Sequence, residues 1–69
     1  MNNKTIKSVN NRILKTMMAD EKELKVLLNT ETTSIPDQQL DGLFVKIEQL
    51  LGRLMVNQNK IMLLQSVGE

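Results

Sequence analysis

Residues 34–65, SIPDQQLDGLFVKIEQLLGRLMVNQNKIMLLQ, decide the fold. Within them, eight positions alternate spacings of three and four residues, and seven of the eight are apolar. This heptad pattern is typical of a helix that packs along one face against another helix. It predicts a helix over about residues 35–66, about 48 Å long at a rise of about 1.5 Å per residue. The eight seam positions are Leu40, Leu43, Ile47, Leu50, Leu54, Asn57, Ile61 and Leu64.

The start of this helix carries its own signals. The preceding stretch, NTETTSIP, is rich in Thr and Ser, whose side chains compete for backbone hydrogen bonds, and the residue before Pro36 is pushed out of the α region. Ser34 followed by Asp37 three residues later fits a capping box, and Pro36 in the first turn loses no intrahelical bond. We therefore expect a turn at 31–34 and a capped helix after it.

The first half of the chain predicts a second helix over about residues 4–30. No Gly or Pro interrupts it, and five apolar residues recur at helical spacing: Ile6, Ile13, Met17, Leu24 and Leu27. Leu14 and Leu28 widen this stripe, whereas Asn10 and Asp20 fall on it and weaken it. The fold class is therefore all-α: one domain over 1–69, forming an antiparallel, coiled-coil-like two-helix hairpin.

A bare hairpin does not use all the apolar residues. Hydrophobic residues make up 41% of the chain, and the two seams hold only five and seven of them. A chain of 69 residues without disulfides rarely builds a sufficient core alone. The surplus predicts an interface, completed by dimerisation or by a different protein. The residues that we expect to bind the partner are Leu14, Met18, Phe44, Leu51, Met55 and Met62.

Composition also narrows the classes of function. The chain has no Cys and no His, which removes thiolate ligands and the commonest metal ligand and general base. It has no Gly-rich phosphate loop and no nucleophile beside a base. We expect no enzyme, no cofactor and no metal. The N-terminus lacks the apolar run of a secretory signal, and no stretch is long enough to span a membrane, so we expect a soluble, cytoplasmic protein.

Charge is segregated although the net charge is only +1. Residues 1–19 carry four bases and no acid: Lys4, Lys7, Arg12 and Lys15. Residues 20–41 carry six acids and two bases. The basic cluster has no aromatic residues for stacking, which makes it a weak signal for nucleic acid.

Three bases repeat every seven residues along the second helix: Lys46, Arg53 and Lys60. They either pair with acids on a partner helix or form a solvated edge whose stems cover the seam. Asp20, Glu21 and Glu23 are also available to meet one of them within the hairpin.

The layout resembles a known family. A helix, a small polar turn and a longer helix opening with PDQQL, Pro36 to Leu40, are similar to the helical-hairpin co-chaperones of bacterial type III secretion. These pair with a tetratricopeptide-like chaperone to keep the needle subunit soluble before export. The resemblance implies a passive mechanism, in which an apolar face covers the aggregation-prone helix of a client.

Three alternatives remain open at this stage. A homodimer of two hairpins would form a four-helix bundle and act as a regulatory or scaffold protein. The chain is also compatible with a needle or filament subunit, which would polymerise with concentration. A nucleic-acid binder using the basic N-terminal half would bind less tightly as salt increases.

Overall fold

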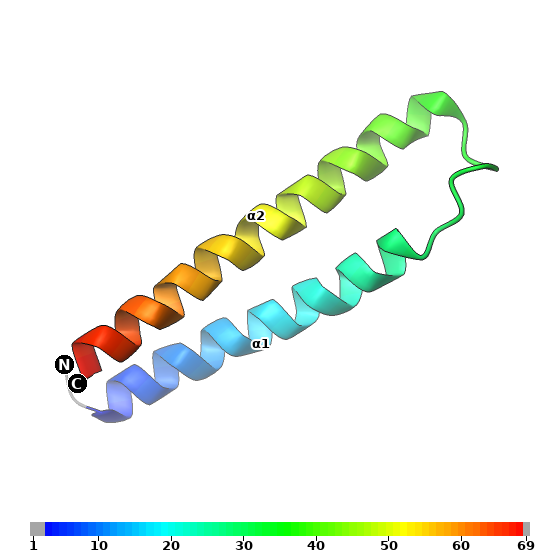
Figure 1. Ribbon diagram of the computed structural model, residues 1–69. Coiled ribbons are helices and arrows are strands. Elements are labelled where there is room, and N and C mark those ends of the chain that lie inside the picture. The colour runs from blue at the N-terminus through cyan, green and yellow to red at the C-terminus, as the bar shows by residue number, and fades with distance from the viewer. Residues whose placement is uncertain (1–2, 69) are drawn as a thin grey trace.

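The computed structural model describes residues 3–68, which form two helices packed antiparallel (Figure 1). Helix α1 spans Asn3–Leu28 and helix α2 spans Asp37–Gly68. The described residues contain no strand. The Cα atoms extend over 51 × 14 × 12 Å, so the molecule is a rod two helices wide and one helix thick. The predicted all-α hairpin is confirmed.

The start of α2 differs from the predicted capping box. The helix begins at Asp37, and the carbonyl of Pro36 accepts hydrogen bonds from the amides of Gln39 (2.8 Å) and Leu40 (3.3 Å). Ser34 therefore lies outside the capping position, and its assignment as the cap is wrong. The reason is Pro36 itself, because a proline keeps the residue before it, Ile35, out of the helical region.

Helix α1 ends at Leu28, and the chain after it satisfies the exposed carbonyls of its last turn. The amides of Asn29 and Thr30 donate to the carbonyls of Lys25 (3.1 Å) and Leu27 (3.2 Å), and the Thr30 hydroxyl donates to the carbonyl of Val26 (3.0 Å). Carbonyls at a helix end have no partner within the helix, so these bonds hold the end of α1 in place. The connection between the helices covers residues 29–36.

The seam between the helices follows the predicted register. Every one of the eight positions expected on α2 is buried or half-buried, and Leu50 is the most buried side chain, at 1% exposed. On α1 the stripe from Ile6 to Leu27 is likewise turned inward, and it includes the two polar residues Asn10 and Asp20. Leu14 and Leu28, expected to widen this stripe, are instead exposed. They lie beside the seam because a second helix of this diameter covers only the narrow two-per-heptad stripe.

Candidate protein-binding surface

One flank of the seam is closed by two ion pairs. The Arg53 guanidinium donates two hydrogen bonds to the Asp20 carboxylate, from Nε to Oδ2 at 2.7 Å and from Nη2 to Oδ1 at 2.6 Å. Lys46 Nζ lies 3.5 Å from Glu23 Oε1 on the same side. We call this side, marked by Glu23, Lys46 and Arg53, the ion-paired flank.

The Asp20–Arg53 pair is the stronger of the two. Asp20 is only 4% exposed and occupies a seam position, so its charge needs a partner. The bidentate geometry supplies that partner, and the hydrogen bonds from Arg53 lower the pKa of Asp20 although burial opposes them. The same contact raises the pKa of Arg53. Glu23 and Lys46 are about half exposed, and such surface pairs contribute at most about 1 kcal/mol.

These contacts change the interpretation of the heptad-spaced bases. Lys46 and Arg53 are neither free for a partner helix nor a merely solvated edge, because both pair with acids of α1. Lys60 lies beyond them near Arg12 and Asn57, and these line a groove of about 360 Å³ with Val9, Ile13 and Thr16. Within residues 3–68 no carboxylate pairs with Lys60.

The opposite flank holds apolar side chains of both helices, with the exposed charges of Glu21, Lys25 and Glu48 between them. At 100° per residue, Leu51 points about 160° away from Arg53, and Phe44 points about 160° away from Lys46. On α1, Leu14 and Met18 are rotated by about 140° to 180° from Glu23 by the same geometry. Since the ion pairs mark one flank on both helices, the apolar side chains of both helices share the other flank.

The structure leaves this flank open to solvent. The six residues expected at a partner interface are each 45% to 68% exposed. They are Leu14 and Met18 on α1 and Phe44, Leu51, Met55 and Met62 on α2. Leu28 is exposed on the same flank, next to the turn. We call these seven residues the apolar face. Their role in binding remains a prediction.

Further apolar residues are exposed away from this face. At 100° per residue, Val26 lies about 60° from Glu23 and Val56 about 60° from Arg53, so both are exposed on the ion-paired flank. Leu63 and Val67 lie within about 80° of Arg53, and Val45 points to the outer side of α2. Gly42 and Gly52 are also on α2, and no atom comes within 4 Å of a Cβ built at either one. No close approach of α1 therefore requires these glycines.

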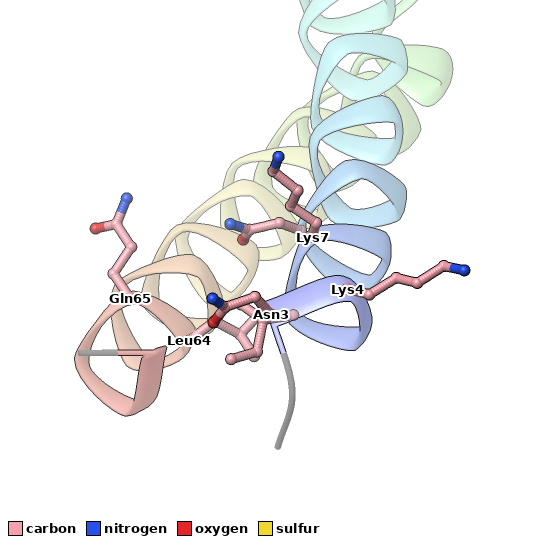
Figure 2. Close-up of a pocket in the computed structure, with 7 residues that line it drawn as sticks. Asn3, Lys4, Lys7, Leu64 and Gln65 are labelled. Carbon is pink, nitrogen blue, oxygen red and sulfur yellow. The ribbon is translucent and has the colours of Figure 1, made fainter.

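The end of the hairpin opposite the connection has a groove on its surface. An open groove of about 720 Å³ lies between the first turns of α1 and the last turns of α2. Figure 2 shows the residues that line it. Asn3 lies beside Leu64 across this groove, while the Lys4 side chain extends away from α2 (Figure 2). Ile6, Lys7, Asn10 and Gln65 complete the lining. The groove is open and partly basic, and it offers no enclosed cavity for a small molecule.

Two other kinds of site are absent from the described residues. Residues 3–68 hold no group of three or more carboxylate, His or Cys side chains arranged to bind a metal ion. Neither α1 nor α2 has the length and apolar character that crossing a membrane requires.

The chain matches no protein-family model, no curated protein and no solved structure. The similarity to type III secretion co-chaperones is therefore supported only at the level of the two-helix hairpin. The exposed apolar residues are the feature of the molecule that bears most directly on function. They indicate contact with a protein partner or with another copy of the chain.

Proposed function

We propose that the chain is a non-enzymatic protein-binding module of the adaptor or chaperone class, and that its partner binds the apolar face. One observation carries this proposal: seven exposed Leu, Met and Phe side chains of the two helices share one flank, opposite the flank on which ion pairs bridge the helices. Burying one such side chain contributes about 1.5–3 kcal/mol. Covering several of them at once is sufficient to drive association.

The shape of the face suits a helical partner. Two antiparallel helices leave a long shallow channel between them, and an amphipathic helix can lay its apolar side along it. Three of the seven residues of the face, Met18, Met55 and Met62, are methionines. Their flexible thioethers adapt to partners of different shape, which suits a chaperone that holds a client by apolar contact alone.

Within this class, we propose a narrower role as a cytoplasmic co-chaperone of a type III secretion needle subunit. The support is the hairpin layout, the short polar connection and the exposed face on both helices. In this role the chain acts with a tetratricopeptide-like chaperone, and the two together cover the needle subunit before export.

The test is a pull-down from cells that carry the gene, using the tagged chain and two matched variants. Leu51 and Val56 are equally exposed, at 49% and 52%, but point to different sides of α2. Leu51→Glu should abolish complex formation while helicity by circular dichroism is retained, and Val56→Glu should bind as the parent does. If every captured protein is retained by Leu51→Glu, the apolar face is not the binding site.

The identity of the captured proteins decides the narrower role. A tetratricopeptide-repeat protein together with a small helical secretion subunit supports the co-chaperone. Capture of other proteins through the same face rejects that role and leaves the protein-binding module standing.

A further inference from the structure

We infer that a second copy of this chain covers the apolar face in the free protein. The two hairpins lie antiparallel, so that the first turn of α1 and the last turn of α2 in one copy lie over the connection between the helices in the other. This inference rests on the proposed function, because it uses the same face. It adds the partner and the orientation, and both follow from how charge is distributed along the rod.

The hairpin is electrically polarised along its long axis. The half near the termini, residues 3–15 with 55–68, carries five bases and no acid: Lys4, Lys7, Arg12, Lys15 and Lys60. The half near the turn, residues 16–54, carries seven acids and four bases, a net charge of −3. One end of a rod with a Cα length of 51 Å is thus basic and the other acidic.

This polarity discriminates between the two symmetric ways of stacking two hairpins face to face. In a parallel pair, the basic ends meet each other and the acidic ends meet each other, so both contacts are repulsive. In an antiparallel pair, each basic end meets an acidic end. The Debye length is about 8 Å at physiological salt, which is comparable to the spacing of packed helices, so these end-to-end charges still interact.

The apolar side chains lie where the antiparallel pair needs them. A two-fold axis relating the hairpins passes through the middle of the rod, where α1 and α2 are each at about half their length. Leu14, Met18, Leu51 and Met55 of the apolar face lie near this point. The centre of the interface is then apolar and its two ends are charged, which is the usual anatomy of a protein interface.

The available area is large enough. The broad side of the hairpin is bounded by Cα extents of 51 and 14 Å, whose product is about 700 Å² per copy before side chains are added. A stable protein interface buries about 800 Å² per partner. Each copy contributes one helix pair, and the product is an antiparallel four-helix bundle in which α1 lies on α1 and α2 lies on α2 of the partner.

The experiment measures the distance between the two turns by electron paramagnetic resonance. The chain has no Cys, so Thr33→Cys in the exposed connection carries a single spin label. Two antiparallel hairpins place their turns about a rod length apart, near the Cα extent of 51 Å. Two parallel hairpins place them within about 20 Å, the width of two packed helices. A long distance supports the inference, and a short distance overturns it.

A second, independent measurement is whether charge reversal at the basic end raises or lowers the dissociation constant of the dimer. Lys4→Glu with Lys7→Glu lowers the net charge of the basic end, residues 3–15 with 55–68, from +5 to +1 and places two acids on the side of the apolar face. This double variant should raise the dissociation constant of an antiparallel dimer at least about tenfold, and added NaCl should weaken the parent dimer. In a parallel dimer both signs reverse, since the substitutions and the salt then relieve repulsion.

Analytical ultracentrifugation of the parent, Leu51→Glu and Val56→Glu completes the test. A parent dimer lost only in Leu51→Glu supports the inference. A parent that stays monomeric up to about 100 μM overturns it, because interfaces of this size have dissociation constants in the micromolar range or below. The proposed function survives that result if the pull-down still depends on Leu51. A dimer lost in Val56→Glu and kept in Leu51→Glu overturns the inference, because the dimer surface is then on another side of α2, and the proposed function is again decided by the pull-down with Leu51→Glu.

Discussion

The two halves of the seam are built differently. In the half near the turn, Leu24 and Leu50 are buried, and the Asp20–Arg53 and Glu23–Lys46 pairs bridge the helices. In the half near the termini Ile6 is buried, but Asn10 and Asn57 occupy seam positions and both described grooves open between the helices. The described residues of this half, 3–15 and 55–68, include no carboxylate to pair with its bases. The hairpin is thus firmly closed at one end and loosely closed at the other.

The difference teaches that a polar seam residue is compatible with a firm seam when it has a partner, as Asp20 has in Arg53. A polar residue at a core position of a heptad lowers stability but favours one alignment of the helices. Asn57 on α2 is buried, and the Oδ1 atom of Asn10 on α1 is buried without a hydrogen-bond partner. The terminal half therefore has less to hold it together, and local opening should begin there.

The largest expected effect breaks the firm half. Leu50→Ala removes the most buried side chain and should lower the free energy of unfolding by about 2–5 kcal/mol, enough to unfold a chain of this size. Ile61→Ala removes a half-buried residue of the terminal half and should cost less. Urea titrations followed by circular dichroism measure both. Equal losses would mean that the two halves contribute equally.

The next effect concerns the bridge between the helices. Arg53→Met leaves the Asp20 carboxylate in the seam without its partner and should lower the melting temperature. Asp20→Leu removes the buried charge itself, and the remaining Arg53 is half exposed, so this variant should be as stable as the parent or more stable. Thermal melts of the two variants should therefore differ in that order. The reverse order would show that the pair is not buried as described.

The same bridge predicts a dependence on pH. Arg53 lowers the pKa of Asp20 in the folded state, so the pair stabilises the hairpin above the ordinary aspartate pKa. This stability is lost as the pH falls through the lowered folded-state pKa. Between about pH 5 and pH 2 the melting temperature of the parent should fall more than that of Asp20→Leu. If the melting temperatures of the two proteins fall equally with pH, the Asp20–Arg53 pair does not cause the pH dependence.

A smaller effect sharpens the comparison by making the loose half resemble the firm one. Asn10→Leu removes an unpartnered buried oxygen and should stabilise the hairpin by about 1 kcal/mol. Asn11→Leu is the matched control, because Asn11 is exposed, and it should change stability by less than about 0.5 kcal/mol. Amide hydrogen exchange should show added protection in residues 3–15 for Asn10→Leu alone.

Much of this architecture follows from the sequence because the spacing of the apolar residues matches the repeat of a helix. The three-and-four spacing from Leu40 to Leu64 predicts both a helix and the face that it buries, and the structure confirms the seam at each position. The position of Pro36 sets the start of α2, but it also outweighs the Ser34 capping signal, and only the backbone geometry decides between them. Local patterns that compete for one residue are the least predictable part of the fold.

Which charged residues pair with each other is harder to predict from the sequence. The positions of Asp20 and Arg53 on their helices are predictable, but their pairing depends on how far one helix is shifted along the other. The length of the connection sets that shift, and a difference of one turn would pair Asp20 with a different residue. The surplus of apolar residues is visible in the sequence, whereas the flank shared by the seven residues of the apolar face is defined only once the ion pairs mark the other flank.

The connection at residues 29–36 also governs the order of events in folding. Asp20 and Arg53 are 33 residues apart in the chain, whereas Ile6 and Leu64 are separated by nearly its whole length. The entropy lost on closing a loop grows with its length, so we expect the contacts nearest the connection to form first and to shorten the loops that later contacts close. Folding should then proceed from the connection toward the opposite end of the hairpin. Weakening the firm half should slow refolding, whereas weakening the terminal half should mainly accelerate unfolding.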